Sequence, residues 1–224
     1  MLSARTLARL PPEILREARK GTLAQHARSL PLGLPLDEVL PDGGLLRGDV
    51  VELAVAGGSA RATSIALAAC AAAQREHTSL GTEVPWCAFV DPSGSLYGPG
   101  VADAGVSLER LLVVRPPVDA VSRIALRLVE SQVFSVVVVD AVGPPGASLA
   151  LSLRTWERTT RRLSIAATSS QSLVLLLTDL ENVRPLPLPV SMRLEISRPS
   201  RETLSLCVAK EKRGRTSELR RVHA

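Results

Sequence analysis

The segment from Gly48 to Thr63 (GDVVELAVAGGSARAT) has the layout of a phosphate-binding loop. An apolar run is followed by a glycine-rich turn and then by residues suited to a helix. In this layout, the pattern G-x-x-x-x-G-K-[ST] holds nucleotide phosphates and Mg²⁺. The pattern positions fall here on four other residues, in the order Val55, Ala60, Arg61 and Ala62. The segment therefore keeps the frame of a nucleotide site while most of its chemical groups are replaced.

Each replacement removes one capability of such a loop. Ala60 carries a Cβ where the backbone must approach a phosphate closely. Ala62 has no oxygen for a metal ion, and Arg61 offers a planar guanidinium in place of a compact ammonium. Backbone N–H groups for an anion remain at Gly57, Gly58 and Ser59. Two interpretations stay open: a vestigial phosphate loop, and a strand-turn-helix unit that merely contains Gly-Gly-Ser.

Composition indicates one compact domain with a large core, since the chain has 224 residues and 46% of them are hydrophobic. The formal net charge of +5 and the pI of about 9.7 favour an anionic partner. Aromatic residues make up only 2% of the chain, which argues against nucleic-acid recognition by base stacking. Any contact with DNA is therefore expected to be weak and dominated by phosphates.

Several functional classes are disfavoured by what the sequence lacks. Arg5 and Arg9 interrupt any apolar core of a signal peptide, and no segment approaches the roughly 18 apolar residues of a membrane helix. We therefore expect a cytoplasmic protein without membrane contact. The three cysteines and three histidines have no metal-ligand spacing, so neither a metal nor a cofactor is expected.

Alternating apolar runs and helical patterns predict an α/β fold. Strands are expected at 49–55, 86–91, 111–114, 134–140 and 173–178, and helices at 63–75, 118–132 and 149–163. Such alternation predicts a mainly parallel sheet flanked by helices. Residues 191–197 and 203–209 alternate in polarity and predict a C-terminal antiparallel hairpin at the sheet edge.

Three segments are expected along the chain: an N-terminal helical segment (1–30), a core (31–209) and a basic C-terminal tail (210–224). Pro31, Pro35 and Pro41 indicate a linker at the start of the core. The tail is expected to be solvated, with a nucleic-acid or partner-binding arm as the alternative.

Five segments in order resemble the core of the RecA recombinase family between Leu34 and Ala209. They are LPLDEVLPDGGLLRGDVVEL, AAAQRE, CAFVD, ADAGVSLERLLVVRP and VVVVD. The resemblance implies a RecA-like fold of the P-loop NTPase type. It also identifies Asp140 with the acid that organises Mg²⁺ at the second Walker strand, although a buried acid ending a strand is the preferred interpretation here.

Further family positions are also altered. The catalytic carboxylate falls on Ser93, which cannot orient an attacking water as a base, and the nucleotide-sensing glutamine falls on Asp179. The short segment Val183 to Pro189 replaces a long DNA-binding loop. The resemblance thus implies a degenerate ATPase site and a protein that is not an enzyme.

A RecA-like chain of this kind is similar to the ImuA family, accessory factors of bacterial damage-induced mutagenesis that are also related to SulA-type division inhibitors. That resemblance implies a non-catalytic role in the SOS response and in translesion synthesis during DNA repair, with association with the nucleoid on DNA damage. It also implies contact with RecA, with an inactive Y-family polymerase homologue and with an error-prone polymerase. Two alternatives remain: a weak ATPase using Arg61, Thr63 and Asp140, and a DNA-binding module.

Two surfaces are candidates for binding. Four arginines at helical spacing form a stripe that could contact DNA phosphates: Arg154, Arg158, Arg161 and Arg162. A solvated helix face is the alternative interpretation. In the N-terminal segment, an apolar stripe could dock on a partner: Ile14, Leu15 and Ala18. A helix covering its own core is the alternative there.

Overall fold

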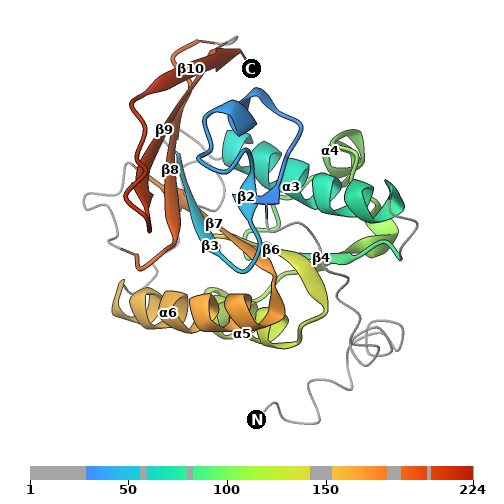
Figure 1. Cartoon of the computed structure of the whole chain (residues 1–224). Coiled ribbons are helices and arrows are strands. Elements are labelled where there is room, and N and C mark those ends of the chain that lie inside the picture. Colours follow the sequence, from blue (N-terminus) through green and yellow to red (C-terminus); the bar gives the residue numbers. More distant parts are fainter. Residues whose placement is uncertain are drawn as a thin grey trace, which may run out of the picture.

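The fold is centred on one eight-stranded sheet with helices on both faces (Figure 1). The computed structural model describes residues 29–55, 60–79, 83–141, 153–180, 188–200 and 203–223. The sheet strands are β3 (Val50–Val55), β4 (Trp86–Val90), β5 (Leu111–Val114), β6 (Phe134–Asp140), β7 (Leu173–Asp179), β8 (Met192–Ser197), β9 (Thr203–Glu211) and β10 (Arg220–His223). Their spatial order is β10-β9-β8-β3-β7-β6-β4-β5.

The helices divide between the two faces of the sheet. They are α3 (Ala60–Ser79), α4 (Gly98–Asp103), α5 (Val121–Glu130) and α6 (Leu153–Ser170), with short 3₁₀ turns η1 (Pro35–Glu38), η2 (Leu108–Arg110) and η3 (Val118–Ala120). Figure 1 shows α3 along one face and α5 and α6 side by side along the other. None of the helices in the described ranges is long and apolar enough to cross a membrane.

The strand pairing confirms the predicted fold class. β3 pairs in parallel with β7 and β8, and β6 pairs in parallel with β4 and β7. All seven residues of β6 (FSVVVVD) are buried, as expected for a β-branched run covered on both faces. β9 then pairs antiparallel with β8 and β10, which is the predicted C-terminal hairpin extended by one strand.

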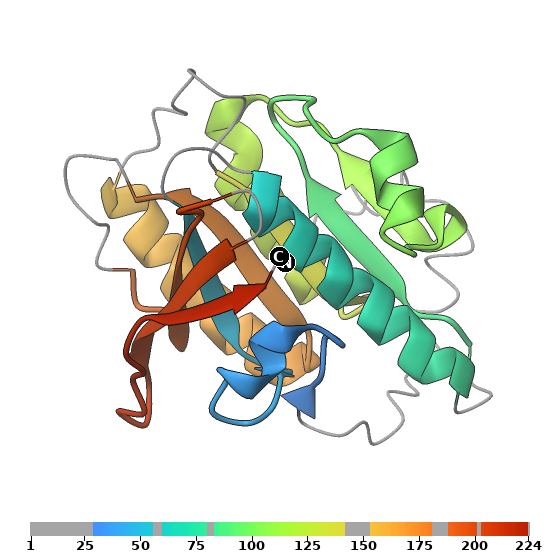
Figure 2. The same cartoon turned by 90° about the horizontal axis from the view of Figure 1, so that it is seen from above.

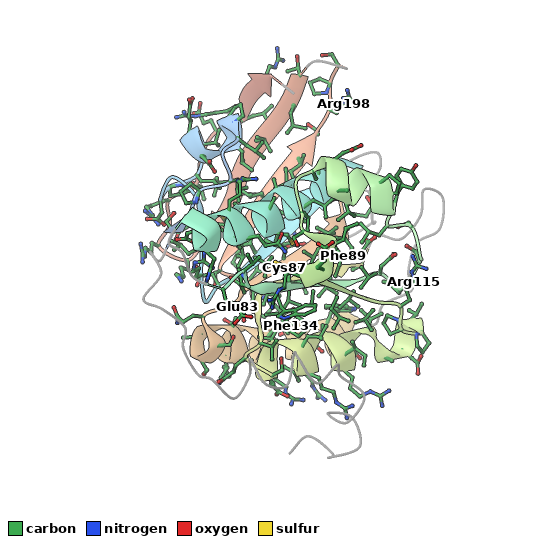
Figure 3. The ribbon with its side chains drawn as sticks, turned by 90° about the vertical axis from the view of Figure 1, so that its right-hand side faces the viewer. Glu83, Cys87, Phe89, Arg115, Phe134 and Arg198 are labelled. Carbon is green, nitrogen blue, oxygen red and sulfur yellow. The ribbon has the colours of Figure 1, made fainter. Side chains whose placement is uncertain are left out.

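Two hydrophobic cores lie on the two sides of the sheet. Figure 3 shows Cys87 and Phe89 on the side of α3, and Phe134 on the side of α5 and α6. The helix α3 packs closely because its inward positions are alanines, which are fully buried: Ala62, Ala66, Ala69 and Ala73. Its small side chains let the helix backbone approach the strands.

The helix predicted at 149–163 has different bounds. In the described part of the chain it begins at Leu153 and continues to Ser170, past the expected end. In its last turns, the hydroxyls of Thr168 and Ser169 donate to the carbonyls one turn earlier, at 2.9 and 3.1 Å. Gln171 then ends it with a positive φ of 57°.

The predicted proline linker is instead part of the folded core. Residues Ser29–Leu30 form β1, which pairs antiparallel with β2 (Leu45–Leu46). Between them, Asp37 accepts hydrogen bonds from the backbone N–H groups of Leu32 and Gly33 at 3.0 and 2.8 Å. The prediction was wrong because the prolines alternate with leucines that pack inward and are almost fully buried: Leu30, Leu32 and Leu36.

The expected solvated tail is also largely structured. β10 continues the sheet, and Figure 2 shows it lying beside the lead-in segment that contains η1. Lys212 donates to both carboxylate oxygens of Asp49, at 2.6 and 2.8 Å. Arg215 binds Asp42 with two hydrogen bonds of 3.0 and 2.7 Å. These basic residues therefore hold the C-terminal strands against the start of the core.

Candidate functional site

The candidate site lies at the carboxyl edge of the parallel strands, where β3 leads toward α3. Ligands of open α/β sheets bind at this edge because the strand-to-helix connections meet there. β3 ends at Val55 and α3 begins at Ala60. The loop residues Gly57, Gly58 and Ser59, and the side chain of Arg61, lie outside the described part of the chain.

Val55 lies directly beside Asp179, its register partner on β7. The N–H of Leu180 donates to the carbonyl of Val55 at 2.8 Å, which extends the pairing beyond the strands. The residue at the family's nucleotide-sensing position is therefore adjacent to the start of the phosphate-loop frame. By the resemblance to recombinases, Asp179 puts a carboxyl group where that family carries the uncharged amide of a glutamine.

Three acids share the α3 side of this edge: Asp91, Asp140 and Asp179. In a strand, residues two positions apart lie on the same face of the sheet. The residues two positions before these acids are Phe89, Val138 and Leu177, which all belong to the core on the α3 side. Asp140 is only 3% exposed. Within the described ranges, no group of three His, Cys, Asp or Glu side chains could hold a metal ion.

Ala62 occupies the metal-ligand position and is fully buried in the first turn of α3. Its methyl group packs in the core between α3 and the sheet. The position is thus used for packing and offers no oxygen.

Ser93 belongs to a loop built around Asp91. The buried carboxylate of Asp91 accepts hydrogen bonds from the backbone N–H groups of Ser95 and Leu96, both at 3.0 Å. It also accepts one from the hydroxyl of Ser93 at 3.1 Å, while Nε of Arg115 lies 3.7 Å away. The position of the family's catalytic carboxylate is therefore held by a hydroxyl that helps to shape its own loop.

A buried polar cluster on the opposite face was not anticipated from the sequence. Glu52, in the middle of β3, is 1% exposed and accepts a hydrogen bond from Thr178 at 2.8 Å. Its other oxygen has no hydrogen-bond partner and lies 3.7 Å from Nη1 of Arg193 on β8. Lys210 is the register partner of Arg193 on β9.

Burial raises the pKa of the Glu52 carboxyl above its usual value because the charged form loses hydration. The hydrogen bond from Thr178 and the charge of Arg193 act in the opposite direction but do not cancel the effect. The only sequence signal was a glutamate inside the otherwise apolar run VVELAV.

The remaining predicted binding residues fall on α6 and on the N-terminal segment. Arg158, Arg161 and Arg162 are exposed on α6, while the side chain of Arg154 lies outside the described part. Arg161 pairs with Glu157 at 2.7 Å and Arg162 with Glu130 on α5 at 3.5 Å. Ile14, Leu15 and Ala18 also lie outside the described residues.

Comparison with known proteins agrees with this architecture. A family model described as the MT3502 N-terminal domain matches residues 38–181. The crystal structure of the RadB recombinase superimposes with a TM-score of 0.66 at 15% sequence identity, covering 87% of this chain and 95% of that one. The fold is therefore RecA-like. A search of curated proteins finds no match.

Proposed function

Since the chain belongs to the MT3502 N-terminal domain family and has a RecA-like fold, we propose that it is a non-catalytic accessory protein of damage-induced mutagenesis. It acts by binding RecA and the polymerase partners of the same pathway, an inactive Y-family homologue and an error-prone polymerase. In this role it limits the growth of RecA filaments.

The observation that carries the proposal is that residues unsuited to ATP hydrolysis occupy the catalytic positions of a RecA-like fold. Phosphoryl transfer depends on placing a metal ion and on orienting the attacking water. Ala62, buried in the core, supplies no metal ligand, and Ser93 donates its hydroxyl to Asp91. These replacements support a protein that kept the shape of a recombinase core without its reaction.

A recombinase-shaped protein without nucleotide chemistry is suited to ending a filament. Head-to-tail filaments grow through a heterologous interface, because every subunit offers two complementary faces. By resemblance, the nucleotide of a recombinase lies at that junction, so Ala62, Ser93 and Asp179 alter one face. A subunit with one working face docks once and then blocks further addition. The N-terminal stripe of Ile14, Leu15 and Ala18 is the proposed docking element.

The proposal is tested by capture of purified RecA on the immobilised full-length chain. Ile14→Asp combined with Leu15→Asp should abolish capture, because charge cannot be buried in an apolar contact. Ser3→Asp combined with Thr22→Asp adds the same charge to polar positions of the same segment and should leave capture intact. Arg61→Ala should also leave it intact.

A parallel assay follows RecA filament length on single-stranded DNA by light scattering. Added protein should shorten filaments at substoichiometric amounts, as expected for a cap. Full capture and full capping by the Ile14→Asp, Leu15→Asp variant would exclude the N-terminal stripe as the contact.

A further inference from the structure

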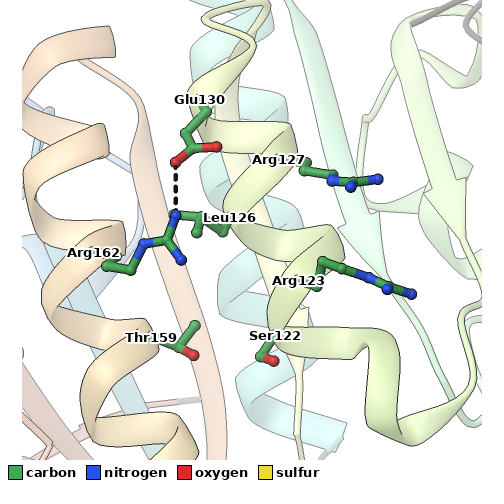
Figure 4. A pocket seen from close by; sticks show the side chains of 7 residues that line it. All are labelled: Ser122, Arg123, Leu126, Arg127, Glu130, Thr159 and Arg162. Carbon is green, nitrogen blue, oxygen red and sulfur yellow. Dashed lines mark hydrogen bonds and ion pairs between the residues drawn. The ribbon is translucent and has the colours of Figure 1, made fainter. Parts of the chain in front are cut away.

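The helices α5 and α6 enclose a groove on the face of the sheet opposite α3 and α4. One end is lined by Ser122, Arg123, Leu126, Arg127, Glu130, Thr159 and Arg162, with a volume of about 340 Å³ (Figure 4). An adjoining hollow of about 320 Å³ shares Glu130 and Arg162 and reaches Ile165 and Ser169. From Thr159 to Ser169 the groove follows roughly 15 Å of α6.

Positive charge borders this groove on both helices. Arg123 and Arg127 stand one turn apart on α5, and Figure 4 shows them on the side of α5 away from α6. Arg158 and Arg162 stand one turn apart on α6, with exposed Arg161 beside them. Of these arginines, Arg123, Arg127 and Arg162 line the first hollow, and Arg158 and Arg161 lie beside it on α6.

The groove also contains apolar surface. Ile165 is 71% exposed and lines the second hollow together with Ala166. Leu126 lies at the base of the first hollow and is 7% exposed. A ligand that covers this groove must therefore bring an apolar face as well as negative charge.

One ion pair lies in the groove and a second lies beside it on α6, and both can exchange a glutamate for a carboxylate of a ligand. Arg162 is held by Glu130 at 3.5 Å and Arg161 by Glu157 at 2.7 Å, and all four side chains are well exposed. Exposed pairs of this kind contribute little to stability, so an incoming carboxylate can replace either glutamate. Figure 4 shows Arg162 reaching from α6 across the groove to α5.

We propose that this groove binds an acidic amphipathic helix of a protein partner, with its carboxylates on the arginines that line or flank the groove and its apolar stripe on Ile165. Helix-in-groove recognition uses this combination of i, i+3, i+4 anchors and flanking charge. The inference deepens the proposed function, because it states the chemistry of a partner segment.

A nucleic acid fits the groove less well. A phosphate backbone has no apolar face to cover Ile165, which is 71% exposed. Neither hollow is lined by an aromatic side chain on which a base could stack. The arginine stripe considered from the sequence is therefore assigned to an acidic protein segment.

The probe for the test is a blocked, fluorescein-labelled peptide of about 14 residues, roughly 21 Å of helix. It carries leucines at helical spacing on one face and glutamates elsewhere. Fluorescence anisotropy with the full-length protein should show saturable binding that weakens as salt rises. A peptide of the same composition with dispersed leucines should bind far more weakly.

Variants of the protein separate the groove from general charge. Ile165→Glu and Arg162→Glu should each weaken peptide binding about tenfold or more, since each places like charge against the ligand. Arg198→Glu is the matched control, because Figure 3 places Arg198 far from α5 and α6. Thermal melting must show that all three variants remain folded.

Three outcomes would overturn the assignment: no saturable peptide binding, equal binding of the dispersed peptide, or tighter Arg162-dependent binding of a single-stranded oligonucleotide. The last result would assign the groove to nucleic acid. RecA capture keeps the two proposals distinguishable. If RecA is captured in an Ile14- and Leu15-dependent manner but no peptide binds, only the groove proposal is refuted. If the peptide binds but RecA is not captured, only the proposed function is refuted.

Discussion

Glu52 on β3 and Arg193 on β8 occupy paired register positions in the interior of the sheet, with Oε2 and Nη1 3.7 Å apart. Both side chains are buried, Oε2 of Glu52 forms no hydrogen bond, and Nε of Arg193 lies 3.3 Å from Oε1 of Glu195. Such a pair is costly to desolvate and more costly still to break, because the surviving charge stays buried alone.

Removing the positive partner should destabilise the protein strongly. Arg193→Met leaves the Glu52 carboxylate without its nearest cation and should lower the free energy of unfolding by about 3 kcal/mol. Adding Glu52→Gln should recover part of this loss, because the buried group is then neutral. Urea denaturation of the two single variants and the double variant measures the coupling. Additive losses would show that the pair does not interact.

The raised pKa of Glu52 predicts how stability varies with pH. A raised folded-state pKa means that its contribution is fully present below the usual value of 4.5 and is lost as pH rises through the folded-state pKa. The cations Arg193 and Lys210 limit this loss, and Glu195 adds to it. Glu52→Gln should therefore flatten the fall in stability above pH 4.5. An unchanged slope in urea midpoints would assign the pH dependence to other groups.

Gly44 should not tolerate a side chain. A Cβ at this position would lie 2.5 Å from the carbonyl oxygen of Leu30 and 2.7 Å from Oγ of Ser29, forcing β1 and β2 apart. We expect Gly44→Ala to cost about 1–3 kcal/mol. Gly98→Ala is the matched control, since a Cβ there meets nothing within 4 Å. Equal melting temperatures for the two variants would contradict the close packing of β1.

Mg-ATP should neither be hydrolysed nor stabilise the fold appreciably. A ligand at a hundred times its Kd would stabilise the protein by about 2.7 kcal/mol and raise its melting temperature. The missing hydroxyl at Ala62 and carboxylate at Ser93 remove the groups that would produce this effect. A large melting shift with Mg-ATP that Arg61→Ala abolishes would refute the inert interpretation and favour a weak ATPase.

The contact between Arg215 and Asp42 should stabilise the C-terminal strands in a salt-dependent manner. Asp42→Asn weakens the paired hydrogen bonds and should lower the melting temperature most at low ionic strength, because partly exposed ion pairs are screened by salt. Asp103→Asn, at an exposed site on α4, is the matched control. A loss that is independent of salt would indicate that the charge of Asp42 is not what matters.

The fold was predictable because its strongest signals are local. The run FSVVVVD specifies a central strand wherever its neighbours lie, and the order of strands and helices then limits the topology. The errors concern residues whose partners are remote in sequence. Lys212 and Arg215 suggested a solvated tail, since nothing near them indicates that Asp49 and Asp42 bind them from across the sheet.

The candidate site was only partly predictable for the same reason. The sequence alone places Ala62 and Ser93 at two family catalytic positions. The structure adds that Ala62 packs in the core and that Ser93 donates a hydrogen bond to Asp91. The cluster of Glu52 could not be foreseen, since its partners Thr178 and Arg193 lie on strands far along the chain. The α5–α6 groove depends on two helices that no motif connects.

The position of β3 has a consequence for how the chain folds during synthesis. β3 is complete once Val55 has been translated, yet its neighbours β7 and β8 begin only at Leu173 and Met192. Through most of translation, both hydrogen-bonding edges of this apolar strand await partners that the ribosome has not yet made. Unpaired strands of this kind are prone to intermolecular association. The nascent chain is therefore expected to need chaperone protection until β8 emerges.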